Sequence, residues 1–248
     1  MDTVESLIAG GRSFLKSNWH RTEGMISDQS KGVAAPAQQK PCPEHSERIA
    51  LAAVEGLSLG SIPVSKAIAD RKSRRKFRPD PLALEELSYL LWATQGVRNS
   101  GPVRSFRTVP SGGARHSFET YLYLARVEGV REGLYRYLPL DHALCLLDSR
   151  QGLDAELDEA LLGQYWNAAA VFVWTTIPYR MEWRYSVVSH KIIALDAGHV
   201  CQNLYIACES IGCGTCAIGA YDQDRMDRFV GADGAEEFTI YAAPVGRA

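Results

Sequence analysis

The chain has 248 residues, of which 46% are hydrophobic and 23% charged, and its formal net charge is −2. This composition is typical of a soluble globular protein with enough residues for a sizeable core, and we expect one large domain. No apolar run approaches the about 18 residues of a membrane-spanning helix, and the N-terminus lacks the basic segment of a secretory signal. We therefore expect a cytoplasmic protein.

The N-terminal part of the chain shows no sustained hydrophobic period. Residues 1–46 are rich in Gly, Ser, Gln and Pro, which indicates an irregular arm that lies on the surface. We place the arm at residues 1–56 and a compact domain at residues 57–248.

A short helix with Pro63 in its first turn is predicted over residues 63–70, and it leads into a basic segment at residues 71–78. Six of these eight residues are Lys or Arg. A dense positive segment in a near-neutral chain indicates one localised anionic partner, such as a phosphate-bearing cofactor. Favourable interaction with the helix dipole explains one or two of the cations but not six.

The remaining elements follow from hydrophobic spacing and from turn residues. A helix is predicted over residues 84–95, with Gly96 after it, and a loop of small residues at 110–117 comes before the first strand. The other predicted elements are strands at 119–127, 133–138 and 143–147, a helix at 153–162, a fully buried strand at 168–177, a helix at 194–211, a short helix from Asp222 to Gly231 and a strand at 237–243. Sheet and helices are segregated, and the fold class is therefore α+β with a mostly antiparallel sheet.

The chain has six cysteines, which we expect to remain reduced. Cys201 and Cys208 lie on the apolar stripe of the helix at 194–211, and we expect them in the core. Cys213 and Cys216 have CxxC spacing, but no second cysteine pair or nearby histidine pair completes a zinc site. We predict no metal.

Several spaced motifs together resemble the nitroreductase family, and within it the SagB-type dehydrogenase branch. They cover residues 57–248 in the order that the family has. The motifs are Arg71-x-Ser73-x-Arg75-x-Phe77, residues 85–96, residues 110–116, Gly133-Leu-Tyr-Arg-Tyr137, residues 196–204 and Pro244-Val-Gly246. The N-terminal arm resembles that branch more loosely.

The resemblance implies an intertwined homodimer that holds FMN at the subunit interface, with NAD(P)H as the electron donor. By motif position, Arg71 and Ser73 would contact the flavin phosphate or ribityl chain, Lys72 would lie beside them, and Arg75 would reach the pyrimidine edge of the ring. A cation at that edge would stabilise the negative charge of reduced flavin.

Three further segments receive roles by the same resemblance. Pro110, Ser111, Gly112 and Gly113 match the loop that reaches the flavin of the other subunit. Ile218, Gly219 and Ala220 match the segment whose backbone faces flavin N5. Arg247 matches a terminal basic residue that binds the phosphate in relatives.

One position departs from the family pattern. Where azoline-oxidising members have Lys-Tyr, this chain has Arg184 and Tyr185, our candidate catalytic residues. An arginine stays protonated and is a poor general base, and Arg184 could instead orient an anionic substrate or the nicotinamide donor. Both residues could equally be ordinary loop residues.

We therefore expect an FMN-dependent oxidoreductase that cycles electrons between NAD(P)H and an acceptor that the sequence does not name. An azoline dehydrogenase that matures a ribosomal peptide is the alternative within the family. Alternatives from other classes are a nucleic-acid-binding protein that uses residues 71–78, and a flavin carrier or sensor without turnover. The segments at 97–107 and 179–190 are where we expect acceptor specificity.

Overall fold

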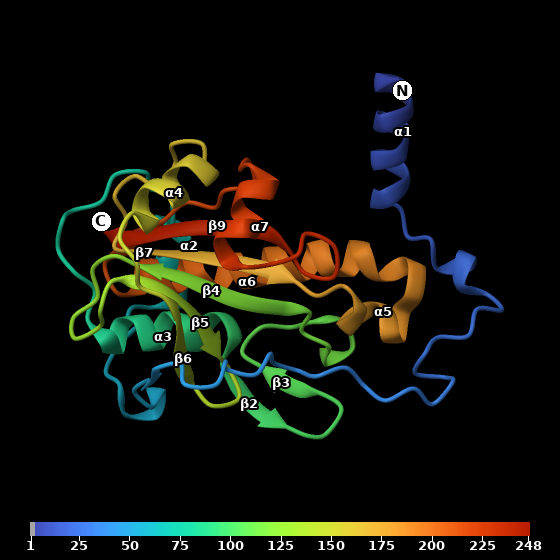
Figure 1. The fold of residues 1–248 in the computed structure, drawn as a ribbon, viewed down its shortest axis with the longest axis horizontal. Coiled ribbons are helices and arrows are strands. Elements are labelled where there is room, and N and C mark those ends of the chain that lie inside the picture. The colour runs from blue at the N-terminus through green and yellow to red at the C-terminus, as the bar shows by residue number, and fades with distance from the viewer. Residues whose placement is uncertain (1–2) are drawn as a thin grey trace.

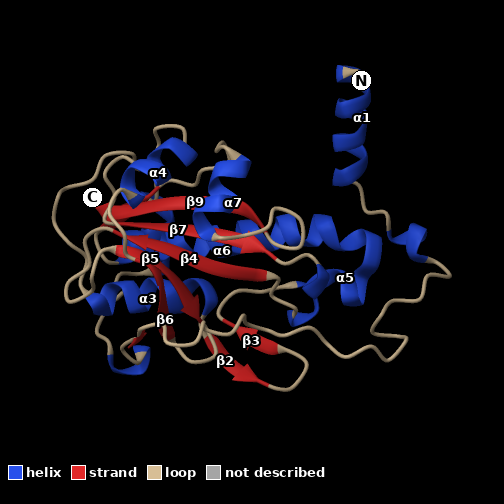
Figure 2. Ribbon diagram, viewed as in Figure 1, coloured by secondary structure: helices blue, strands red, loops and turns tan. Residues whose placement is uncertain are grey.

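A seven-stranded sheet with the order β1-β6-β5-β4-β7-β9-β8 forms the centre of the computed structural model, which describes residues 3–248 (Figures 1 and 2). Every neighbouring pair of strands is antiparallel, which confirms the predicted α+β class. The strands are β1 (Arg48–Ala50), β4 (Phe118–Leu124), β5 (Gly133–Leu138), β6 (Ala143–Asp148), β7 (Ala170–Thr176), β8 (Cys213–Thr215) and β9 (Phe238–Arg247). A separate hairpin consists of β2 (Val97–Ser100) and β3 (Ser105–Arg107).

Helices cover both faces of this sheet. The α-helices are α1 (Val4–Leu15), α2 (Val64–Asp70), α3 (Leu84–Gln95), α4 (Leu153–Ala160), α5 (Tyr179–Tyr185), α6 (Ser189–Ser210) and α7 (Gln223–Val230). Phe172 and Trp174 of β7 pack in one core with α3 and α6, whereas Val171 and Val173 pack in a second core with α4 and α7. Successive strand residues point to opposite faces, and the strand is therefore buried throughout, as predicted. No helix within residues 3–248 is long and apolar enough to cross a membrane.

The helix predictions agree with the structure at most boundaries. The α3 helix has the predicted bounds, and α7 begins after Asp222, whose side chain accepts a hydrogen bond from the Arg225 N–H at 3.0 Å. The α6 helix begins at Ser189, five residues before the predicted start. Ser189 and Ile193 are both buried and extend the buried stripe of the helix toward its N-terminus.

The arm contains a regular helix that the sequence pattern did not predict. Helix α1 begins after Thr3, which caps it, because the Thr3 hydroxyl accepts a hydrogen bond from the Ser6 N–H. The expectation of an irregular arm is therefore wrong for residues 4–15, where Gly10 and Gly11 obscured the helical period. The helix has no buried residue and projects from the rest of the chain (Figure 1). The domain boundary at residue 56 stays a prediction.

A disulfide joins Cys42 of the arm to Cys145 of β6. The expectation that all six cysteines are reduced is therefore wrong for this pair. The two residues are 103 positions apart, and only the path of the arm across the sheet brings them together. The other four cysteines are free and buried, and Cys201 and Cys208 lie in the core as predicted.

A buried carboxylate anchors the arm a second time. Glu119 of β4 accepts hydrogen bonds from the Arg180 guanidinium at 2.5 Å and from the Lys40 backbone N–H at 2.8 Å. Its second oxygen lies 3.9 Å from Nε of Arg136. All three charged side chains are nearly inaccessible to water. The Glu119 carboxylate therefore compensates the buried positive charges of Arg180 and Arg136.

We predict that Glu119→Ala destabilises the protein by about 3–5 kcal/mol, because it leaves two buried guanidinium groups without their carboxylate. Urea unfolding measures the change in the free energy of unfolding. Glu128→Ala is the matched control, since Glu128 is exposed and forms no ion pair within the described chain. A loss below about 1 kcal/mol for Glu119→Ala, the size of an ordinary surface effect, would contradict the anchoring role.

Candidate functional site

The basic segment at residues 71–78 lies along the edge of the sheet, beside β8 and β9. The Arg74 N–H donates to the Thr215 carbonyl at 2.9 Å, and the Arg78 N–H donates to the Arg247 carbonyl at 3.1 Å. Glycine in the strands permits this close approach. A Cβ at Gly214 would lie 2.3 Å from Cδ of Arg74. The segment is therefore fixed to the fold through its backbone.

Some cations of this segment are neutralised within the chain. Arg74 donates to both carboxylate oxygens of Glu209, at 3.0 and 3.1 Å. Arg78 lies 3.5 Å from the carboxylate of Asp80. These two arginines are among those for which the sequence suggested no ligand.

The three cations of this segment that are predicted to bind flavin have no carboxylate partner within residues 3–248. Arg71 lies over the ring of Tyr205, with 5.2 Å from its guanidinium carbon to the ring centroid, and Arg75 lies over Trp166 at 5.9 Å. Lys72 is exposed and forms no ion pair with a described residue, and the same is true of Lys76. Arg71, Lys72 and Arg75 are therefore available to an anion.

Tyr205 of α6 connects the basic segment to the second predicted segment of the site. Its hydroxyl lies 2.9 Å from Oγ of Ser73 and accepts a hydrogen bond from the Ala217 N–H at 2.8 Å. Ser73 and Ile218, which are far apart in the sequence, are thus held near one tyrosine. Residue patterns gave no signal for this role, because Tyr205 lies beside the apolar stripe that identified the helix.

The segment from Ile218 to Ala220 offers free backbone donors. Ile218 is buried and bonded to β9, with its N–H 2.7 Å from the Ala242 carbonyl. Gly219 and Ala220 are exposed, and their N–H groups have no acceptor among the described residues. A Cβ at Gly219 would meet only Tyr241, at 4.0 Å, so space beside this backbone is open. Two N–H donors without an acceptor, next to a cationic segment, fit a flavin ring and its phosphate.

Arg247 is engaged elsewhere. Its guanidinium donates to both carboxylate oxygens of Glu86, at 2.6 and 2.7 Å. A phosphate at this position would share the guanidinium with Glu86. The predicted phosphate contact of Arg247 stays a prediction.

The loop from Pro110 to Gly113 packs against α5 and α6 instead. The Gly112 N–H donates to Oδ2 of Asp196 at 3.2 Å, and a Cβ at Gly112 would lie 2.4 Å from a methyl carbon of Ile192. Gly113 has φ of 58°, and its Cβ would lie 2.5 Å from the hydroxyl of Tyr185. Both positions therefore require glycine.

Burial raises the pKa of Asp196, although hydrogen bonds from Ser111 and from the Gly112 N–H oppose that rise. The Asp196 carboxylate thus holds the loop by accepting hydrogen bonds from Ser111 and from the Gly112 N–H.

The two candidate catalytic residues lie beside this loop. Arg184 places its guanidinium over the Tyr185 ring, 5.3 Å from the centroid, and its Nε would lie 3.1 Å from a Cβ at Gly113. Trp19 of the arm meets the Tyr185 ring edge-on, with centroids 5.8 Å apart. The structure therefore brings Arg184 and Tyr185 together with the loop, as part of one surface that also includes the arm.

Helix α6 separates the two groups of predicted residues. Asp196, which holds the loop, and Tyr205, which holds the basic segment, are nine residues apart in α6. Nine residues correspond to about 13 Å of rise and two and a half turns, so the two side chains leave the helix on opposite sides. The two groups of predicted residues therefore lie on opposite sides of α6 within one copy of the chain.

Comparisons with known proteins agree with this fold. The model of the nitroreductase family matches residues 68–247. A candidate nitroreductase of Methanocaldococcus jannaschii is 32% identical over 188 residues, which are 75% of this chain and 91% of that protein. The crystal structure of a candidate nitroreductase of Ralstonia eutropha JMP134 is similar with a TM-score of 0.66 and 27% identity, over 87% of this chain and 97% of that one.

A further solved structure has a similar fold over almost the whole chain. It is the McbBCD microcin synthetase complex of E. coli with truncated pro-MccB17 bound, at a TM-score of 0.61 and 18% identity. The match covers 99% of this chain and 94% of that one. At this identity it shows the fold alone.

The loop also contains a buried histidine that cannot take up a proton readily. His116 is 3% exposed, and burial, together with the charge of Arg107, lowers its pKa to about 3. In the unfolded chain its pKa would be about 6.5. Between these two pKa values the imidazole is protonated in the unfolded state but neutral in the folded state. The free energy of unfolding therefore falls as the pH falls from about 6.5 toward 3.

We predict that wild-type protein loses about 1.4 kcal/mol through His116 between pH 7.5 and 5.5, the value for an imidazole with a pKa of about 6.5 that titrates only in the unfolded state over this interval. His116→Asn should lack this loss, and asparagine tolerates the φ of 46° at this position. Urea unfolding at both pH values measures the difference. His45→Asn is the control, because His45 is exposed and has a similar φ of 66°. Equal pH dependence in the wild type and His116→Asn would contradict the buried neutral imidazole.

Proposed function

Because the chain belongs to the nitroreductase family, we propose that it is an FMN-dependent oxidoreductase that transfers electrons from NAD(P)H to an acceptor. The observation that carries this proposal is the pairing of the basic segment. Within residues 71–78, Arg74 and Arg78 have carboxylate partners, whereas Arg71, Lys72 and Arg75, which the family resemblance assigns to the flavin, have none among the described residues. Lys76 is also without a carboxylate partner there, and Arg247, which the resemblance assigns to the phosphate, is paired with Glu86.

The two segments that Tyr205 connects would contact different parts of the cofactor. Arg71 and Ser73 would bind the phosphate or ribityl chain, with Lys72 beside them, and Arg75 would hold positive charge near the pyrimidine edge of the ring. The Gly219 and Ala220 N–H groups would direct hydrogen bonds toward the ring. FMN, when bound, supplies the hydride chemistry, and the protein supplies position and charge.

A second copy of the chain would complete each site. The loop at residues 110–113 is held by Asp196, on the side of α6 opposite Tyr205, and we infer that it covers the flavin of another copy rather than that of its own chain. In a two-fold homodimer each loop can cover the flavin of the partner, and two equivalent sites result.

An azoline dehydrogenase acting on a modified peptide is the second candidate. The SagB-type resemblance and Tyr185, which lies against the loop at Gly113, favour it. Arg184 disfavours it, since a guanidinium is a poor general base where relatives have lysine. Oxidation of an azoline-containing peptide by the purified protein would support this candidate, and NAD(P)H-dependent turnover without such oxidation would reject it.

We predict that Arg71→Gln/Arg75→Gln lowers the affinity for FMN at least about 100-fold, because two charge-assisted contacts of about 1.5–3 kcal/mol each are lost. The measurement is the FMN content per chain after purification, from the visible spectrum and from the flavin released on denaturation. The variant should fold normally, because neither arginine has an ion-pair partner within the described chain.

The matched control is Lys76→Gln/Arg78→Gln, which removes the same charge from the same segment. This control should retain FMN at the wild-type level. A yellow Arg71→Gln/Arg75→Gln protein with a full complement of FMN would contradict the proposed cofactor site.

A further inference from the structure

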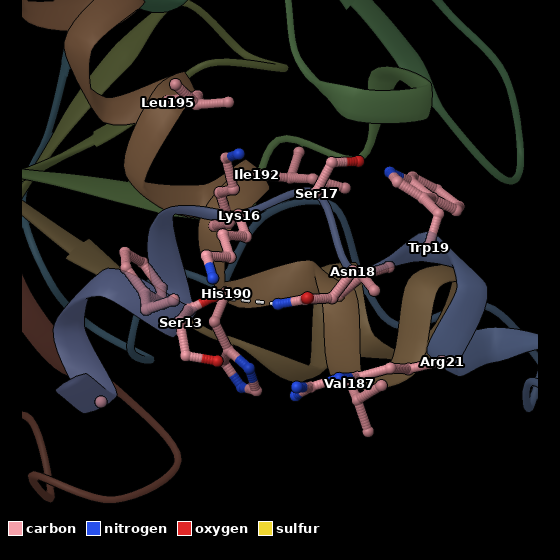
Figure 3. A pocket seen from close by; sticks show the side chains of 14 residues that line it. Ser13, Lys16, Ser17, Asn18, Trp19, Arg21, Val187, His190, Ile192 and Leu195 are labelled. Carbon is pink, nitrogen blue, oxygen red and sulfur yellow. Dashed lines mark hydrogen bonds between the residues drawn. The ribbon is translucent and has the colours of Figure 1, made fainter.

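A cavity of about 480 Å³ lies between the N-terminal arm and the junction of α5 and α6 (Figure 3). One wall comes from residues 10–21 of the arm and the other from residues 187–195. Neither the fold nor the predicted flavin site accounts for it. We call it the arm cavity.

The arm cavity is cationic although the whole chain is slightly acidic. Lys16, Arg21, His190 and Lys191 line it, and no Asp or Glu is among its described lining residues. Lys191 donates to the Leu15 carbonyl at 2.5 Å. His190 is paired at 2.8 Å with Glu182, which lies outside the cavity, and this carboxylate offsets part of the positive charge.

Two of these cations are free to bind a ligand. Lys16 and Arg21 have no carboxylate partner within residues 3–248. In Figure 3 the side chain of Arg21 extends toward His190 and the hydroxyl of Ser13, whereas Lys16 extends toward Ile192 and Leu195. The cations therefore reach the cavity from more than one side.

Beside the polar Ser13, Ser17 and Asn18, the lining also has apolar and aromatic side chains. Phe14, Trp19 and Leu195 are 45%, 52% and 55% exposed, so these lining side chains leave apolar surface accessible to a ligand. Apolar walls favour a flat hydrophobic body, and the unpaired cations favour a negative charge attached to it. The combination selects a ligand that is both aromatic and anionic.

The arm cavity adjoins the surface that carries the candidate catalytic residues. Ile192 lines the cavity and also packs against Gly112, and Trp19 lines it and also packs against Tyr185. The arm that follows is pinned to α5, because the Gln29 N–H donates to the Trp183 carbonyl and the Trp183 indole N–H donates to the Val33 carbonyl, both at 2.9 Å. A ligand in the cavity would thus lie next to the loop that covers the flavin of the partner subunit.

We propose that the arm cavity binds the electron acceptor and that this acceptor is an anionic aromatic compound. Arg21 and Lys16 bind its negative group, and Trp19 and Phe14 contact its ring. The role as acceptor site rests on the proposed function, whereas the binding of an aromatic anion does not.

The test compares two ligands that differ in charge, 4-nitrobenzoate and 4-nitrobenzyl alcohol. Equilibrium dialysis against the full-length purified protein gives the Kd of each, and the FMN content of the same sample is measured separately. We expect 4-nitrobenzoate to bind at least about tenfold more tightly, with an affinity that falls as salt is added.

Two variants locate the effect. Arg21→Gln should weaken binding of 4-nitrobenzoate about tenfold and leave the alcohol unchanged, because only the charged contact is lost. Arg12→Gln removes the same charge from an exposed position of α1 that does not line the cavity, and it should change neither Kd. Equal Kd values for the two ligands, unchanged binding in Arg21→Gln, or no binding of either ligand would overturn the cavity assignment.

Turnover then separates the cavity from the proposed function. Reduction of the nitro group to nitroso takes one hydride from NAD(P)H, which supplies both electrons, and one proton from solvent, and the oxygen that is lost leaves as one water. In protein that contains FMN, the preference for 4-nitrobenzoate should appear in kcat/KM and should be lost in Arg21→Gln. Selective binding in a protein that neither retains FMN nor oxidises NAD(P)H would uphold the anion site and overturn both the acceptor role and the proposed function.

Discussion

Burial of the apolar stripe of α6 against α3 and the sheet is the interaction on which both groups of predicted site residues depend. Leu204 and Cys208 are almost completely buried in this contact, which fixes the rotation of the helix about its own axis. That rotation directs Tyr205 toward the basic segment and Asp196 toward the loop at Gly112. A helix turned by a third of a revolution would lose both contacts, and the site therefore follows from packing rather than from the site residues themselves.

Charge pairing then decides which arginines remain available. Glu209, one turn after Tyr205, forms an ion pair with Arg74, and Glu86 of α3 forms one with Arg247. Each carboxylate lies on a helix that packs in the core. The same packing that places Tyr205 therefore also places the carboxylates that pair with Arg74 and Arg247, and these two arginines are less available to a ligand. What remains positive is a short stretch around Ser73. A basic segment that looks uniform in sequence is thus divided into structural and available cations.

Local patterns predicted the elements whose packing is local. The bounds of α3 and β5 and the Asp222 cap of α7 followed from spacing and from turn residues, because the buried face repeats regularly within each element. Contacts between distant segments had no such pattern. The disulfide between Cys42 and Cys145 and the hydrogen bond to the Tyr205 hydroxyl join segments that are distant in the sequence. The arm cavity likewise has walls from two distant segments, residues 10–21 and 187–195. The helix α1 was not predicted because Gly10 and Gly11 interrupt its apolar spacing and none of its residues is buried.

The claim that one flavin site needs two copies of the chain can be tested with a mixed dimer. One copy carries Arg71→Gln/Arg75→Gln and the other Gly113→Val, which disrupts the loop at a φ that a β-branched residue does not tolerate. Different affinity tags on the two copies allow the mixed dimer to be purified. We predict that each homodimer lacks NAD(P)H oxidation, whereas the mixed dimer regains one of its two sites and about half of the wild-type rate. A mixed dimer that is as inactive as its parents would contradict a site shared between subunits.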